Sequence, residues 1–177
     1  MTIYFLRHAS AGKNRPNPKQ DEKRPLDKEV IAQCREIGRA LAACDTQVDA
    51  IISSPLKRAT QTAALVGNEL GFEGSIKIEP SLRPEAAYAE FRDMLRKYGK
   101  LDSIMVVGHN PTESEFCSRL LTQGDETEVI DLKKGGVARV EFNGKNDAEL
   151  MWCITPRLVR ALQASSTERS RPKTARK

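Results

Sequence analysis

Short apolar runs alternate with segments of helical periodicity along most of the chain, and this alternation limits the folds open to it. The strand-like runs cover residues 3–6, 48–52, 76–78 and 103–107. The helical segments, with apolar residues three or four positions apart, cover residues 27–41, 55–70, 84–98 and 112–121. Parallel strands need long crossover connections, which helices commonly supply. The sequence therefore predicts an α/β protein with a three-layer, open, mostly parallel sheet and helices on both faces.

The segment between the first strand and the first helix is polar. Residues 9–25 contain several prolines and no helical pattern, so they predict a loop. Asp27 stands just before the first helical segment, where a short carboxylate side chain can accept from free backbone amides. We expect Asp27 to cap that helix.

The carboxyl-terminal part predicts a hairpin, a helix and a basic tail. Runs 137–142 and 150–154 flank a turn containing Asn143-Gly144, and a last helix is expected from Pro156. Of the net charge of +5, segment 163–177 carries +4, from five basic residues and one acidic residue, which leaves +1 for the rest. We expect one domain over residues 1–162 and a basic, mobile tail over 163–177.

Targeting and cysteine patterns exclude several classes of protein. No run approaches the roughly 18 apolar residues that a membrane span needs. The first residues lack the basic segment and long apolar stretch of a secretory signal, so we expect a cytoplasmic protein without membrane contact. The four cysteines are scattered and form no C-x-x-C pair, which indicates neither a zinc site nor a disulfide framework.

The chain holds two histidines, and each closely follows a predicted strand. His8 comes after the run 3–6, and His109 comes after the run 103–107. Ligands of open α/β sheets bind at the carboxyl ends of the strands, so both imidazoles should face one rim. The helix after the second strand opens at the same rim and carries Arg58 in its first turn. Topology therefore brings Arg7, His8, Arg58 and His109 together.

This set of side chains is cationic. Two guanidinium groups beside two imidazoles suit an anion, because the forked donors of arginine match phosphate oxygens. A metal site would need more histidine, cysteine or carboxylate ligands and fewer cations. The sequence therefore favours a phosphate ligand and no metal.

Three motifs resemble those of the histidine phosphatase, or phosphoglycerate-mutase-like, superfamily. Leu6-Arg7-His8-Ala9 resembles the Arg-His-Gly signature, Ser53-Ser54-Pro55-Leu56-Lys57-Arg58 opens a stretch similar to the second motif, and Val106-Val107-Gly108-His109-Asn110-Pro111 resembles the third. The short chain, Arg24-Pro25-Leu26 and Thr155-Pro156-Arg157 resemble the SixA-type phosphohistidine phosphatase branch. The motifs follow the order of the superfamily, and the resemblance extends over residues 1–160.

The resemblance implies a phosphoglycerate-mutase-like fold and a phosphatase that needs no cofactor. His8 would attack phosphorus and become phosphohistidine, while Arg7, Arg58 and His109 would bind the phosphoryl oxygens. The substrate would be a phosphohistidine on a protein, such as a histidine-phosphotransfer domain. The physical chemistry agrees, since phosphoryl transfer depends on positioning and on stabilising an anionic transition state. One nitrogen of His8 must donate to a neighbour, such as a backbone carbonyl, so that the other can attack.

Three further positions carry expectations from this resemblance. Asn14 lies six residues after His8, where relatives often carry a residue that touches the phosphate. Arg24 is either a residue of the pocket mouth or a solvated loop charge. Ala9 replaces the glycine of the signature, which matters only if the backbone there requires a positive φ.

The general acid is the weakest part of the pattern. Relatives that act on alkyl phosphate esters place a carboxylate after the third strand, because an alkoxide leaving group needs a proton. Glu85 is the candidate in that segment, and Glu113 beside the third motif is a second one. Either could instead be a first-turn carboxylate that the helix dipole favours. A phosphohistidine substrate needs the acid less, since imidazole leaves more easily than an alkoxide.

Two alternatives to a protein phosphohistidine phosphatase stay open. The same chemistry could act on a small phosphorylated molecule, as a phosphatase or as a mutase, although the chain has little room for the extra segments of mutases. A protein of another class, a phosphate-sensing or nucleic-acid-binding module, would use the basic tail. That second function leaves the placement of both histidines unexplained, so we do not expect nucleic acid as a partner.

Overall fold

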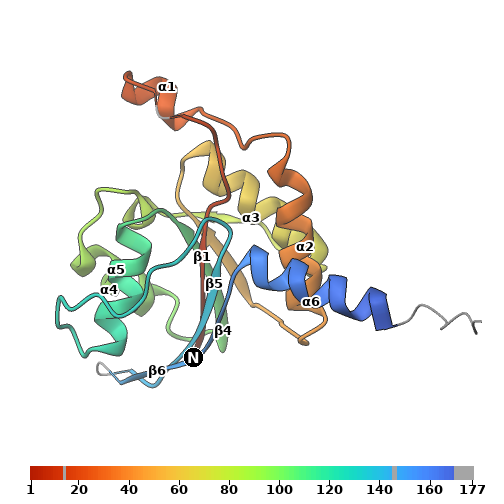
Figure 1. Cartoon of the computed structure of the whole chain (residues 1–177). Coiled ribbons are helices and arrows are strands. Elements are labelled where there is room, and N and C mark those ends of the chain that lie inside the picture. Colours follow the sequence, from red (N-terminus) through yellow and green to blue (C-terminus); the bar gives the residue numbers. More distant parts are fainter. Residues whose placement is uncertain (14, 145–146, 170–177) are drawn as a thin grey trace, which may run out of the picture.

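A single mixed sheet forms the centre of the protein (Figure 1). The computed structural model describes residues 1–13, 15–144 and 147–169, and of residues 166–169 the backbone alone. In this part of the chain the strand order is β3-β2-β4-β1-β5-β6. The strands are β1 (Thr2–Arg7), β2 (Ala50–Ser53), β3 (Lys77–Ile78), β4 (Ser103–Gly108), β5 (Val137–Phe142) and β6 (Ala148–Ile154).

The strands from β3 to β1 are parallel, and the carboxyl-terminal hairpin extends the sheet in the antiparallel sense. β4 pairs with β2 on one side and with β1 on the other, both in parallel, and β2 pairs with β3 in parallel. β5 runs antiparallel to β1, and β6 runs antiparallel to β5. The mostly parallel α/β fold predicted from the sequence is confirmed.

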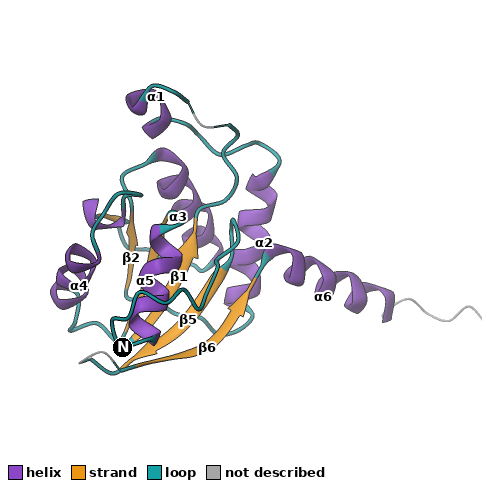
Figure 2. Ribbon diagram, turned by 60° about the vertical axis from the view of Figure 1, so that its left-hand side comes forward, coloured by secondary structure: helices purple, strands orange, loops and turns teal. Residues whose placement is uncertain are grey.

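Helices cover both faces of the sheet (Figure 2). One layer contains α4 and α5, and the other contains α2, α3 and α6. A short helix, α1, lies at the end of the molecule to which β1 points (Figures 1 and 2). The helices are α1 (Pro18–Glu22), α2 (Val30–Ala42), α3 (Lys57–Glu69), α4 (Tyr88–Lys97), α5 (Thr112–Leu121) and α6 (Pro156–Arg169), with a 3₁₀ turn at Pro80–Leu82.

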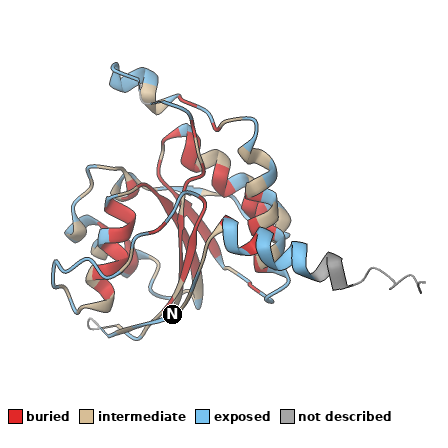
Figure 3. Cartoon of the chain, viewed as in Figure 1, coloured by how far each residue is buried: buried red, intermediate tan, exposed pale blue. Residues whose placement is uncertain are grey.

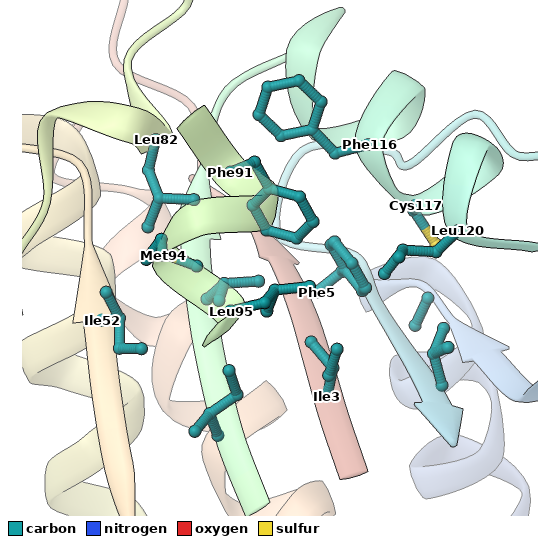
Figure 4. Packing of buried hydrophobic residues seen from close by; sticks show 14 of the residues in the cluster. Ile3, Phe5, Ile52, Leu82, Phe91, Met94, Leu95, Phe116, Cys117 and Leu120 are labelled. Atoms are coloured by element: carbon teal, nitrogen blue, oxygen red, sulfur yellow. The ribbon is translucent and has the colours of Figure 1, made fainter. Parts of the chain in front are cut away.

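Alternation along the buried strands divides the core into two clusters. In β1, Ile3 and Phe5 face the α4–α5 layer, while Tyr4 and Leu6 face the other layer. Successive strand residues point to opposite faces, so a strand covered on both sides must be apolar throughout. Figure 4 shows Phe91 between Phe5 and Phe116 in the first cluster. Burial is concentrated in the sheet and the inner helix faces, as Figure 3 shows.

The helices differ from the sequence expectations in three respects: an additional short helix, the cap of α2 and the start of α4. Within residues 9–25, Asn17 caps the short helix α1 by accepting from two backbone amides, so this segment is not wholly a loop. Asp27 does not cap α2, which has Glu29 at its N-cap position and no side-chain cap there. Asp27 accepts instead from the Gly12 amide at 2.9 Å and so ties the loop back on itself. The helix expected from residue 84 begins at Tyr88.

The last helix begins where the sequence predicted and continues further than expected. α6 runs from Pro156 to Arg169, so its backbone extends into the segment 163–177 that we expected to be a tail. Val159 packs in the core, whereas Leu162 is 62% exposed. Residues 170–177 lie outside the described part, and the division between domain and tail stays a prediction. No helix in the described residues is long and apolar enough to span a membrane.

Candidate active site

Both histidines lie at the carboxyl ends of adjacent central strands. His8 follows β1 and His109 follows β4, and the His8 amide donates to the Gly108 carbonyl at 3.1 Å. Because β1 and β4 are parallel and in register, the two rings come to lie beside each other, with centroids 4.9 Å apart. Both side chains are almost completely buried. The pairing predicted from strand order is therefore present.

The ring of His8 is held in one orientation by the backbone of the next residue. Nδ1 lies 2.6 Å from the Ala9 carbonyl oxygen, which can only accept, so Nδ1 carries the hydrogen. Nε2 therefore keeps its lone pair, and it accepts from Arg58 Nε at 3.3 Å. Burial, together with the charges of Arg58, Arg7 and Lys134, lowers the pKa of His8 to about 4, although the bond to Ala9 opposes the shift.

Ala9 fits the position that the signature assigns to glycine. It is fully buried, its amide donates to Thr62 Oγ1 at 3.2 Å, and it is not among the described residues with a positive φ. An alanine at this position therefore introduces no backbone strain.

Arg58 reaches the pocket from the first turn of α3. Its side chain is 6% exposed, and Nη1 donates to both the backbone oxygen and the carboxylate of Asp21, each at 3.1 Å. The same carboxylate accepts from Arg24 Nε at 2.8 Å. These contacts, led by the hydrogen bond from Arg24, lower the pKa of Asp21 to about 2. Asp21 is thus an anion that links two cationic side chains.

His109 is oriented by the end of β2. Its Nε2 lies 2.8 Å from Ser54 Oγ, and its Nδ1 is buried without a partner in the described part of the chain. Burial, followed by the neighbouring His8 and Arg58, lowers the pKa of His109 to about 2. The ring is therefore neutral at physiological pH, with one nitrogen still available for a hydrogen bond.

Arg7 is anchored by the loop before β5. Its Nη1 donates to the Leu132 carbonyl at 2.7 Å, and the amide of Asn110 donates to the same oxygen at 3.0 Å. This shared acceptor joins the first and third motifs across the sheet. Burial lowers the pKa of Arg7, and the charge of Asp131 partly offsets that shift.

These side chains line a cavity of about 450 Å³ at the carboxyl ends of β1 and β4. Arg7, His8, Arg58 and His109 all contribute to its wall, together with Asp21, Arg24, Asn110 and Lys134. A larger cavity of about 720 Å³ lies near Met1 and Phe142, at the other end of β1 and away from the histidines. The first cavity therefore has the composition of an oxyanion site, with several cations and two neutral imidazoles against one carboxylate.

Comparison with known families agrees with this arrangement. The profile of the histidine phosphatase superfamily, branch 1, matches residues 3–97 of the chain. The chain belongs to that superfamily. As a member of that superfamily, the protein is a phosphatase.

Individual relatives cover nearly the whole chain. An uncharacterised protein of Picosynechococcus is 27% identical over 161 residues, which are 85% of this chain and 95% of that protein. The solved structure of the protein histidine phosphatase SixA with tungstate superposes with a TM-score of 0.78 at 22% identity, over 89% of this chain and 98% of SixA. The crystal structure of a SixA protein from Agrobacterium tumefaciens superposes with a TM-score of 0.73 at 22% identity, over 88% of this chain and 97% of that protein. At this identity the structural likeness concerns the fold.

Neither candidate acid lies in the wall of the histidine phosphatase cavity. The side chain of Glu85 is 70% exposed, and its carboxylate lies 3.7 Å from Arg83 Nη1. Glu113 is buried behind Gly108, its Oε1 has no partner in the described residues, and burial raises its pKa well above the usual value. Glu113 is therefore a core residue that does not face the cavity. Asn14, expected at the phosphate, lies outside the described residues.

Sequence reasoning missed Asp21, Ser54 and Lys134. Asp21 lies in the short helix α1 and Lys134 in the loop before β5, so the rule that ligands bind at strand ends predicts neither, and Ser54 carries no signal beyond its place in the second motif. Arg24, left open between pocket and solvent, lines the cavity and is buried. The spacing Asp21-x-x-Arg24 between Pro18 and Pro25 is the sequence signal that could have revealed that pair. No cluster of three or more metal-ligating residues occurs in the described ranges.

Proposed function

We propose that this histidine phosphatase hydrolyses phosphohistidine on proteins, without a metal, through a phosphohistidine intermediate on His8. The hydrogen bond from His8 Nδ1 to the Ala9 carbonyl carries the proposal. It fixes the tautomer in which Nε2 has a free electron pair, inside a cavity lined by guanidinium groups. A buried imidazole that is neutral at pH 7 is a nucleophile ready for phosphorus.

The first chemical step exchanges one phosphorus–nitrogen bond for another. His8 Nε2 attacks phosphorus, and the bond to the substrate imidazole breaks in line with the attack. The bonding electrons leave with the substrate imidazole, which takes a proton from solvent. In the second step water attacks the phosphoryl group on Nε2, which frees His8 and inorganic phosphate. Arg58 must release its hydrogen bond to Nε2 for the attack.

Charge stabilisation comes from donors that are already in place. Arg58 and Arg7 present guanidinium groups to the cavity, and His109 Nδ1 has no partner among the described residues. With the Ser54 hydroxyl donating to His109 Nε2, the hydrogen of this ring resides on Nδ1 and can bond a phosphoryl oxygen. Donors fixed before the reaction need no reorganisation as charge develops, and each such donor commonly contributes about 3 kcal/mol.

The choice of substrate rests on the lack of a protonated carboxyl group in the described cavity wall, where the one carboxylate, Asp21, has a pKa of about 2 and is bound to Arg24 and Arg58. An alkoxide leaving group needs a proton donor near the leaving oxygen. Glu85 is exposed and Glu113 is enclosed in the core, so neither lies in the wall. An imidazole leaving group needs no such donor, which supports phosphohistidine over an alkyl ester.

A substrate panel in EDTA tests the proposal. We expect the protein to release phosphate from a phosphorylated histidine-phosphotransfer protein and from free phosphohistidine at least about a hundred-fold faster than from sugar phosphates. His8→Ala should abolish turnover, and rapid quenching of the wild type should trap an acid-labile, base-stable phosphoprotein. Glu85→Gln serves as the matched control. Preference for a sugar phosphate, or activity retained in His8→Ala, would overturn the proposal.

A further inference from the structure

A second cavity, of about 460 Å³, adjoins the candidate active site. It lies between the loop before β5 and the start of α6, and it shares Arg7 and Lys134 with the catalytic cavity. Five cationic side chains contribute to it: Arg7, Lys133, Lys134, Arg157 and Arg160. We call this cavity the basic groove. Residues 1–162 carry a net charge of only +1, so such a concentration of cations needs an explanation.

Few carboxylates neutralise the basic groove. Asp131 pairs with Lys133, and Glu36 lies 3.8 Å from Arg160. Lys134, Arg157 and Arg7 form no ion pair with any carboxylate in the described residues. The positive charge of Lys134 also acts on His8, whose pKa it lowers. An excess of positive charge therefore continues from the phosphoryl site out to the surface.

The groove is built from extended surface side chains rather than from an enclosed pocket. The side chain of Lys133 is 65% exposed and that of Arg160 is 52% exposed. Small ligands bind in concave sites that bury most of their surface, whereas exposed charges serve to steer and orient macromolecules. The lining contains no aromatic side chain on which nucleic-acid bases could stack. These features favour a protein partner over a small molecule or a single-stranded nucleic acid.

We propose that the basic groove docks an acidic surface next to the phosphohistidine of the substrate protein. The inference rests on the proposed function, since a phosphohistidine seated at His8 places its flanking residues near Arg7 and Lys134. Arg157 and Arg160, one turn apart at the start of α6, then face carboxylates of the partner. Such complementarity raises the rate of association more than the rate of the chemical step.

A charge-altered variant tests the groove. Arg157→Glu/Arg160→Gln changes two exposed positions that lie outside the catalytic cavity. Lys77→Gln/Lys100→Glu makes equivalent changes on β3 and before β4, away from the groove. The substrates are free phosphohistidine and two phosphohistidine peptides, one flanked by glutamates and one by glutamines.

We expect the wild type to have a kcat/KM on the acidic peptide about ten-fold above that on the neutral peptide, an advantage that falls as salt rises from about 50 to about 300 mM. The groove variant should lose this advantage, through KM, and keep its turnover of free phosphohistidine within about two-fold. The control variant should behave as the wild type. Equal kcat/KM for both peptides in the wild type, or an advantage that survives in the groove variant, would overturn the docking proposal.

Binding separates this proposal from the proposed function. The His8→Ala protein, with and without the groove substitutions, is titrated with the unphosphorylated acidic peptide and with a single-stranded oligonucleotide. Tighter binding of the acidic peptide that depends on Arg157 and Arg160 supports docking even if no phosphohistidine is hydrolysed. Failure of hydrolysis alone therefore counts against the proposed function only. Groove-dependent binding of the oligonucleotide and not of the peptide would contradict a protein partner.

Discussion

His8 and His109 face each other in a buried, positively charged setting, and this setting determines their protonation. Desolvation and the nearby guanidinium groups lower the pKa of His8 to about 4 and that of His109 to about 2. The unfolded chain, with ordinary histidines, binds more protons than the folded chain between pH 4 and the usual value of 6.5. The free energy of unfolding therefore falls as the pH is lowered through this window. Above pH 6.5 both imidazoles are neutral in the folded and in the unfolded chain, so they no longer make the stability depend on pH.

A titration by NMR tests this state directly. Because the chain has two histidines, its imidazole spectrum is simple to assign. We expect neither ring to change its Cε1–H shift between about pH 7.5 and about pH 5.5, where an exposed histidine passes through its midpoint. A normal midpoint for His8 would contradict the buried, neutral nucleophile. Addition of vanadate, an anion, should raise the pKa values of both His8 and His109.

Asp21 is a positioning residue for the two cations that it links. Its carboxylate binds Arg58 Nη1 and Arg24 Nε, so Asp21→Asn removes a charged acceptor from both. Hydrogen bonds to charged groups contribute about 1.5–3 kcal/mol, so we expect kcat/KM to fall about ten-fold or more. Asp93→Asn, on the exposed surface of α4, is the control. Unchanged kinetics in Asp21→Asn would show that Arg58 is held without it.

At the scale of elements, the junction between β4 and α5 depends on close packing between Gly108 and Glu113. A methyl group on Gly108 would overlap Glu113 Oε2, and Glu113 is fully enclosed and cannot swing into solvent. We therefore expect Gly108→Ala to lower the free energy of unfolding by about 1–3 kcal/mol. Urea unfolding provides the measurement.

A double-mutant cycle isolates that contact. Glu113→Ser removes the overlapping carboxylate, so Gly108→Ala should cost much less in a Glu113→Ser background than in the wild type. Additive effects of the two substitutions would place the strain elsewhere.

The elements that the sequence predicted best are those whose two faces are both buried. β1 and β4 are continuous apolar runs, and the strand-end rule then gives the neighbourhood of His8 and His109. Boundaries set by contacts distant in sequence were missed. Asp27 has the chemistry of an N-cap, but its carboxylate binds Gly12, and no local pattern distinguishes the two uses. Asp21 enters the site from the short helix α1 and Lys134 from the loop before β5, and the positions of both segments depend on the finished fold.

For the whole molecule, the basic end of the chain provides a test of the alternative binding function. The last buried side chain in the described part of α6 is Val159, and Leu162 is already largely exposed. Deletion of residues 163–177 should therefore leave the thermal unfolding temperature and the turnover of free phosphohistidine unchanged. A nucleic-acid-binding module that uses this segment would lose its affinity instead. Loss of turnover would place the segment in the catalytic unit.

The central position of β1 has a consequence for biosynthesis. β1 precedes both of its partners in the sequence, because β4 and β5 come from the second half of the chain. During synthesis His8 therefore lacks the strands that flank β1 until translation has passed residue 142 and β5 has left the exit tunnel. Contacts so distant in sequence form slowly, and incomplete chains keep the apolar face of β1 exposed to chaperones and proteases. A stalled fragment of this protein would therefore be inactive and prone to aggregation.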